Sequence, residues 1–456
     1  MYLNDTIAAI STPVGEGGIG IVRISGGAAE EIARKLFLKK QSGGMQSHRF
    51  YYGEIVDPES GDILDEAMLV LMRAPRSYTR EDVLEIQCHG GYLLVRKVLD
   101  LVLRLGARTA EPGEFTKRAF LNGRIDLLQA EAVIEVIRGK TEAALALAQH
   151  QREGLLSKKI VDAKDGILNS LALIEAYIDF PEDDIILPHY QQIEESVLQS
   201  LSIIEQLLDS YHEGKVLREG VSVLIAGRPN VGKSSLLNTL LQEKRAIVTS
   251  VPGTTRDIIE EVVNIKGLPV KLLDTAGIRD TEDEIEQEGM KMTLEKIPLA
   301  DLILFVVDNA RTFNNEDILI MQAVSSRPCI VVRNKCDLPS VAQLPESMNR
   351  VKLLSVSARN GDGIEDLRGA IFSQFIRGGI PEGREFIALS QARHKEVLEK
   401  AKHQLVSFLN CFPGEPALEF AALDLRDALR SLGEVSGETT PDDILELIFS
   451  RFCIGK

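Results

Sequence analysis

One stretch constrains the fold of this chain more than any other, the run GRPNVGKS at residues 227–234. It has the spacing GxxxxGK[ST], follows a run of buried-strand character at 221–226, and precedes a segment that opens a helix. This strand–loop–helix order directs backbone N–H groups at a phosphate chain. Lys233 would neutralise the charge of the phosphates, and the Ser234 hydroxyl would bind Mg²⁺. The stretch predicts a nucleotide-binding P-loop in an α/β sheet, and the alternative is an ordinary glycine turn.

Three further motifs follow in the order that a guanine-nucleotide site requires. In DTAG, at 274–277, the Asp can reach the water shell of a metal and the Gly N–H can meet the terminal phosphate. In NKCD, at 334–337, the carboxylate of Asp337 can accept the ring N–H and the amino group of guanine, and adenine lacks that ring N–H. SAR, at 357–359, would close the base pocket with a backbone donor. Together the four motifs predict a GTPase.

The group that orients the attacking water is not obvious from these motifs. Small signalling GTPases carry a glutamine directly after DTAG, where this chain has Ile278. Nearby side chains that could serve are Arg256, Arg279, Glu282, Asp283, Glu284 and Glu286. The acidic run 280–288 is equally compatible with the solvated start of a helix.

The 456 residues divide by pattern into three kinds of structure. Residues 1–118 read as mixed α/β, whereas 119–215 and 379–456 read as helical; between them, 219–378 alternates strand and helix signals. The simplest architecture is a helical domain interrupted by an inserted α/β GTPase domain, and three consecutive domains remain the alternative. Apolar residues recur at helical spacing in both helical parts: Ile193, Val197, Leu201, Ile204 and Leu208, then Val397, Ala401, Leu405 and Phe408.

The charge and cysteine content limit the classes of function. A net charge of −16 lacks the basic footprint of a nucleic-acid binder, so composition gives no support for RNA binding. The five cysteines are scattered, which favours neither a disulfide framework nor a zinc site. Because we find neither a secretory signal nor a membrane-spanning run, we expect a cytoplasmic protein.

Beyond the P-loop, the chain resembles the MnmE (TrmE) family of tRNA modification GTPases over essentially its whole length. The stretches that carry the resemblance are DTIAAI at 5–10, GIVRISG at 20–26, PGEFTKRAFLNG at 112–123, GTTRD at 253–257 and CIGK at 453–456. The CIGK ending is highly specific to the family, whereas many GTPases share the P-loop.

The resemblance implies how GTP is bound and hydrolysed. It implies K⁺ in place of an arginine finger, held by Asn230, Thr249, Val251 and Thr254, with Mg²⁺ on Ser234 and Thr255. Glu286 would position water through a further water, and Arg256 is a second catalytic candidate. The GTP-binding residues that we expect are Asn230, Val231, Gly232, Lys233, Ser234, Ser235, Thr249, Ser250, Val251, Pro252, Gly253, Thr254, Thr255, Asp274, Thr275, Ala276, Gly277, Asn334, Lys335, Asp337, Ser357, Ala358 and Arg359.

The resemblance also implies that the N-terminal domain binds a tetrahydrofolate derivative, 5,10-methylene or 5-formyl, and forms a homodimer. The folate residues carried over are Arg23, Glu85, Arg124 and Lys456, and many relatives have Lys where this chain has Arg124. Without the resemblance, Arg23 and Arg124 would be read as ordinary surface charges. Cys453 would be catalytic, and the alternative for it is an inert thiol on a frayed tail.

The end of the chain predicts one more helix. Thr440 reads as its N-cap, with Pro441 at the first helical position, and Ile444, Ile448 and Phe452 as its buried face. This helix would hold the CIGK tail in a fixed place.

The function implied is a potassium-stimulated GTPase that acts with the flavoprotein MnmG. Together they would add a (carboxymethyl)aminomethyl group to carbon 5 of the wobble uridine of certain tRNAs. Folate would supply the carbon, the FAD of MnmG the redox step, and ammonium or glycine the nitrogen. Two alternatives stay open: a regulatory GTP switch on RNA or the ribosome, and a folate aminomethyl-transfer enzyme with the insert as regulator.

Overall fold

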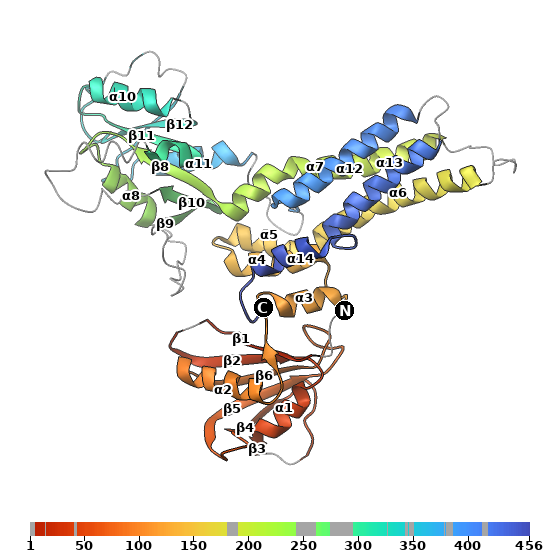
Figure 1. Cartoon of the computed structure of the whole chain (residues 1–456). Coiled ribbons are helices and arrows are strands. Elements are labelled where there is room, and N and C mark those ends of the chain that lie inside the picture. The colour runs from red at the N-terminus through yellow and green to blue at the C-terminus, as the bar shows by residue number, and fades with distance from the viewer. Residues whose placement is uncertain are drawn as a thin grey trace.

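Figure 1 shows the computed structural model of the chain, with an α/β domain, a helical region and a second α/β domain. The structure describes residues 5–13, 15–40, 43–179, 190–242, 261–273, 295–325, 327–342, 345, 351–377, 379, 386–412 and 418–456. Within these ranges no helix is long and apolar enough to cross a membrane.

The N-terminal domain is a seven-stranded sheet with helices packed on one face. Its strands are β1 (Ile7–Ile10), β2 (Gly17–Ser25), β3 (Phe37–Lys39), β4 (Phe50–Val56), β5 (Ile63–Met72), β6 (Val83–Gly90) and β7 (Arg108–Thr109), in the order β3-β4-β5-β6-β2-β1-β7. Helices α1 (Ala29–Leu36) and α2 (Tyr92–Arg104) share a core with the sheet through side chains such as Ile32 and Val98. Because side chains alternate along a strand, β4 buries Tyr51 and exposes Phe50 and Tyr52.

The helical domain is built from two separated parts of the chain. Its helices are α4 (Leu127–Arg138), α5 (Glu142–Arg152), α6 (Leu155–Asp179) and α7 (Tyr190–Glu219), then α12 (Ala392–Cys411), α13 (Leu418–Ser436) and α14 (Asp442–Ser450). One core joins α6 and α7 to α12 and α13, and Figure 1 shows these helices side by side. The predicted apolar positions from Ile193 to Phe408 all contribute to this core. The prediction of an interrupted helical domain is therefore confirmed.

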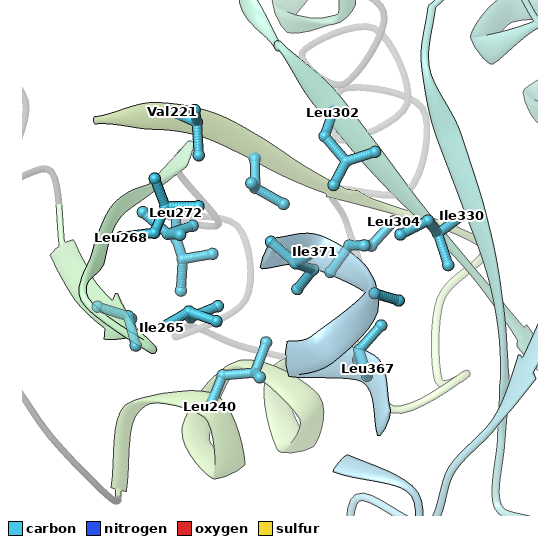
Figure 2. Close-up of a cluster of buried hydrophobic side chains, with 14 of the residues drawn as sticks. Val221, Leu240, Ile265, Leu268, Leu272, Leu302, Leu304, Ile330, Leu367 and Ile371 are labelled. Carbon is cyan, nitrogen blue, oxygen red and sulfur yellow. The ribbon is translucent and has the colours of Figure 1, made fainter. Parts of the chain in front are cut away.

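The inserted domain is a six-stranded sheet between two layers of helices. Its elements are β8 (Val221–Ala226), α8 (Lys233–Gln242), β9 (Glu261–Ile265), β10 (Leu268–Leu273), β11 (Leu302–Asp308), α10 (Asn315–Val324), β12 (Cys329–Asn334), β13 (Lys352–Ser355) and α11 (Ile364–Phe375). The strand order is β13-β12-β11-β8-β10-β9, parallel except for β9. Figure 2 shows Leu240 of α8 and Ile371 of α11 packing with strand residues such as Leu304. A second core covers the other face of the sheet, with Ile320 of α10.

Two details of the domain edges differ from expectation. Helix α3 (Glu114–Leu121) spans the boundary that the sequence placed at 118, so this boundary falls inside a helix. The last helix begins at Asp442 with Pro441 in the N-cap position, so the prediction of Thr440 as N-cap is wrong. The Thr440 hydroxyl instead donates to the carbonyl oxygen of Glu434 at 2.9 Å.

The buried face of α14 is also shifted by one residue. Leu445 and Phe449 are its buried residues, whereas Ile444 and Ile448 are only half-buried. Phe452 is buried as predicted, but it lies in the turn after the helix. Because the helix starts later than predicted and ends before Phe452, its inward stripe follows the 445–449 spacing.

Candidate functional site

The P-loop connects the buried strand β8 to helix α8 and surrounds one ammonium group. Asn230 and Gly232 adopt positive φ angles of 61° and 94°, which turn the loop around the Lys233 side chain. The Nζ of Lys233 donates to the carbonyl oxygens of Gly227 at 2.9 Å and Arg228 at 2.7 Å. Among the described residues no carboxylate pairs with it, and burial lowers the pKa of Lys233 to about 8. This arrangement suits a phosphate, which would supply the missing negative charge.

The NKCD motif is bonded directly to the P-loop. The side-chain amide of Asn334 donates to Val231 O at 2.8 Å, and its Oδ1 accepts the N–H of Ala358 at 3.0 Å. Nζ of Lys335 reaches Asn230 O at 2.9 Å. A Cβ on Gly232 would lie 2.2 Å from Asn334 Nδ2, so this close approach requires glycine. The base-binding and phosphate-binding segments thus form one framework.

Asp337 is exposed, and its orientation is fixed by a neighbour. Ser357 Oγ donates to Asp337 Oδ1 at 2.7 Å, and this hydrogen bond is the largest cause that keeps the pKa of Asp337 below its usual value. The hydroxyl of Thr239 holds the next segment through Ala358 O at 2.8 Å. An ionised, oriented carboxylate at this edge can accept two N–H groups of guanine.

The structure brings part of the predicted nucleotide site together. Asn230 to Ser235, Asn334, Lys335, Asp337 and Ser357 to Arg359 lie on the P-loop and the adjoining edge of the sheet. The other predicted residues lie outside the described residues: Thr249, Ser250, Val251, Pro252, Gly253, Thr254, Thr255, Arg256, Asp274, Thr275, Ala276, Gly277 and Glu286.

A second site forms where the C-terminal tail, residues 453–456, meets the N-terminal sheet. Arg23 of β2 and Glu85 of β6 are directly opposite in the antiparallel register, and their side chains pair at 2.8 Å. Arg23 Nη1 also donates to the carbonyl oxygen of Gly455 at 3.2 Å, as does Ser11 Oγ at 3.2 Å. Residues more than 430 positions apart thereby meet.

The tail needs glycine at this point of contact. Gly455 has φ 91°, and a Cβ there would lie 2.4 Å from Ile10 O. Upstream, the N–H of Gly113 approaches Cys453 O at 3.5 Å, and Phe452 is buried against α4. The thiol of Cys453 is exposed. The tail is therefore held by its backbone, which leaves this side chain accessible.

Two aromatic rings lie beneath the arginines of this second site. The guanidinium carbon of Arg23 is 5.8 Å from the centroid of Phe115, and that of Arg124 is 4.9 Å from the centroid of Tyr78. Both rings belong to one apolar cluster, and burial raises the pKa of Tyr78. Lys456 forms no ion pair within the part of the chain that the structure describes.

Sequence reasoning did not select Ser11, Tyr78 or Phe115 for this site. Phe115 lies inside the PGEFTKRAFLNG run, which was the signal that could have drawn attention to it. Ser11 and Tyr78 have no local signal, because their role depends on contacts with distant segments.

The parallel sheet, the P-loop and its bonded NKxD motif define a P-loop GTPase domain, here inserted into a helical domain. Family models agree with this organisation. "GTP-binding protein TrmE N-terminus" matches residues 6–124, and "MnmE helical domain" matches 127–453. The chain belongs to the MnmE family of tRNA modification GTPases and is itself a GTPase.

Curated relatives match over the full length. The tRNA modification GTPase MnmE of Geobacter metallireducens is 62% identical, and that of Geotalea uraniireducens is 61% identical, with 100% of each chain covered in both cases. Among solved structures, Aquifex aeolicus Era bound to GDP and AlF4⁻ is 27% identical over 40% of this chain and 66% of that chain, with a TM-score of 0.27.

Proposed function

We propose that this chain uses GTP hydrolysis to drive modification of tRNA at carbon 5 of the wobble uridine. It acts in the cytoplasm as a homodimer and together with the flavoprotein MnmG, and adds a (carboxymethyl)aminomethyl group. The observation that supports this proposal most is the docking of the 453–456 tail on Arg23, beside Glu85. That contact brings the tail, with the exposed Cys453, onto an arginine–carboxylate pair of the N-terminal sheet.

In the GTPase domain, Lys233 neutralises phosphate charge and Asp337 selects guanine. The Ser234 hydroxyl at the start of α8, together with Thr255, is suited to Mg²⁺ as an oxygen ligand. We place K⁺ on Asn230, Thr249, Val251 and Thr254. Bound there, the ion would offset charge that develops on the bridging oxygen during hydrolysis.

Ile278 offers no polar atom to orient the attacking water. On the family resemblance, we propose that Glu286 orients it through a further water. Arg256 is the second catalytic candidate. Both residues would act on GTP. The carbon chemistry would take place at the second site, where the C-terminal tail meets the N-terminal sheet, which we call the tail site.

The tail site has side chains that fit a tetrahydrofolate derivative. Arg124, Arg23 and Lys456 can bind the carboxylates of the glutamate tail, and the half-buried carboxylate of Glu85 can accept N–H groups of the pterin. Phe115 and Tyr78 offer ring faces close to the arginines. When bound, folate supplies the one-carbon unit, and the exposed Cys453 of the docked tail is the catalytic candidate at this site.

We place the domain limits at 1–118 for folate binding and dimerisation, 219–378 for GTP hydrolysis, and 119–215 with 379–456 for the helical domain. Helix α3 crosses the first of these proposed limits, because it continues to Leu121.

Reconstitution tests this function. Purified chain, MnmG, tRNA, GTP, KCl, 5,10-methylenetetrahydrofolate and ammonium are combined, and the mass of the wobble nucleoside is measured. We expect the mass of the aminomethyl product, and none when either protein is omitted. An unchanged nucleoside would favour a regulatory switch, and a product formed without MnmG would favour an independent transferase.

A further inference from the structure

Three charged side chains lie along one edge of α4, and each contacts a different part of the chain. Glu131, Glu135 and Arg138 are spaced i, i+4 and i+7, so they follow one another along the same side of the helix. Their partners are far away in sequence. We define these three residues as the α4 edge.

The first contact joins the α4 edge to the point where the chain returns from the GTPase domain. Glu131 is 3% exposed; its Oε1 accepts from Arg393 Nη2 at 2.9 Å, and its Oε2 faces His394 Nε2. Arg393 and His394 are in the first turn of α12, the first helix after the insert. Burial favours the neutral acid, but the charges and hydrogen bonds of His394 and Arg393 prevail and lower the pKa of Glu131.

The second contact joins the α4 edge to the point where the chain enters the GTPase domain. Arg218, in the last turn of α7, pairs most closely with its neighbour Glu219, and its Nη1 also lies 3.9 Å from Glu135 Oε1. β8 begins three residues later, at Val221. Glu135, Arg138 and Arg218 also line one pocket together with Ser390, on the returning segment. Both covalent connections of the insert therefore adjoin α4.

The third contact joins the α4 edge to the C-terminal tail. Arg138 Nη2 donates to Arg451 O at 2.9 Å, and Arg451 is the C-cap residue of α14, two residues before Cys453. Phe449 and Phe452 pack in one cluster with Leu127 and Ile134 of α4. Figure 1 shows α14 beside α4, with the C-terminus next to the N-terminal domain. A movement of α4 would thus carry the tail with it.

We propose that the α4 edge couples the nucleotide state of the GTPase domain to the docking of the 453–456 tail, with Arg218 and Arg138 as positioning residues. A reorientation of the insert would act on α7, on the segment that leads into α12, or on α5, whose Leu147 shares the core of the insert. Of these, α7 contacts α4 through Arg218 and α12 is hydrogen-bonded to it through Arg393. The contact at Glu131 is the most sensitive to such shifts, because breaking it would leave a buried charge without compensation. This inference rests on the proposed function, because the coupling would regulate the tail that we assign to the modification site.

Hydrogen exchange of the backbone amides in 450–456 tests this coupling without folate, tRNA or MnmG. The full-length chain is measured with GDP and with a non-hydrolysable GTP analogue, both with Mg²⁺ and K⁺. For the wild type we expect tail exchange rates that differ at least about fivefold between nucleotides, the lower end of usual coupling between sites. Arg218→Gln should keep the GDP rate and lose the difference, whereas Arg138→Gln should also raise the GDP rate.

Arg426→Gln is the matched control. Arg426 pairs with Glu175 at 2.7 Å between α13 and α6, away from the α4 edge, so this variant should keep the nucleotide response. GTP hydrolysis by all three variants should stay within about twofold of the wild type, which a general loss of structure would not allow.

The outcomes separate this inference from the proposed function. Equal tail exchange in the two nucleotides, or a response that survives in Arg218→Gln and Arg138→Gln, would overturn the coupling even if tRNA is modified. A response with the expected variant pattern would support the coupling even if reconstitution gives no modified tRNA.

Discussion

The substitution Gly455→Ala should release the tail without unfolding the protein. Gly455 has φ 91°, where an L side chain is strained, and an added Cβ would lie 2.4 Å from Ile10 O and 3.0 Å from Ser11 Cα. Both obstacles are backbone atoms of the N-terminal domain, so a side-chain rotation cannot relieve them. The docked conformation has to be abandoned or distorted.

The size of the effect follows from the backbone strain and from the hydrogen bonds that hold Gly455. The left-handed backbone costs about 1–2 kcal/mol for a residue with a side chain. Displacement weakens at least one of the hydrogen bonds that Ser11 and Arg23 donate to Gly455 O, worth about 1 kcal/mol. The sum of about 2–3 kcal/mol corresponds to a roughly 30- to 150-fold increase in the population of undocked tail.

Hydrogen exchange measures this population directly, because amide exchange in the tail reports local opening. Exchange in 450–456 should accelerate by the factor given above, while exchange in the core strand β6 should stay unchanged. Gly27→Ala is the matched control, since a Cβ there meets no atom within 4 Å. Tail exchange within about twofold of the wild type would refute the docking of Gly455.

Three further predictions concern the GTPase domain. Asp337→Asn should weaken GTP binding at least about 100-fold, because two charge-assisted hydrogen bonds to guanine disappear. The variant should favour xanthosine triphosphate, since an amide can donate to the 2-oxo group of xanthine. Unchanged GTP affinity in a competition assay would contradict this prediction. Since burial lowers the pKa of Lys233 to about 8, GDP affinity measured by calorimetry should fall as the pH rises from 8 to 10, and Lys233→Met should remove that part of the dependence. GTP hydrolysis should be much faster in KCl than in NaCl, and equal rates would remove potassium from the mechanism.

The same lowered pKa has a consequence for folding. Between about pH 8 and 10.5 the unfolded chain binds more protons at Lys233 than the folded chain does. The contribution of this group to the free energy of unfolding therefore rises with pH over this window. Below pH 8 the charged ammonium is held at a cost, which a bound phosphate would offset.

The sequence was sufficient for the architecture of the GTPase domain because its signals are local. The strand, loop and helix around Lys233 lie within about twenty consecutive residues, and the apolar spacing from Ile193 to Phe408 reveals both halves of one core. The helical spacing of apolar residues predicts the buried face of the last helix less accurately. Packing against α4 buries Leu445 and Phe449 rather than Ile444 and Ile448.

The tail site could be anticipated only through family resemblance. Arg23 and Glu85 carry no local signal, since their pairing depends on the register of β2 with β6. The contact of Arg23 with Gly455 depends on how the helical domain returns the chain to the sheet. Likewise, the spacing of Glu131, Glu135 and Arg138 suggests only a solvated helix edge until their partners are known.

A complementation experiment tests most directly whether residues 453–456 complete the modification site. A bacterial strain without its own MnmE receives either the whole chain or a version that ends at Phe452, and the wobble nucleoside of its tRNA is measured by mass. The whole chain should restore modification and the shortened chain should not, although the purified shortened chain hydrolyses GTP at a near-normal rate. Restored modification with the shortened chain would contradict the account.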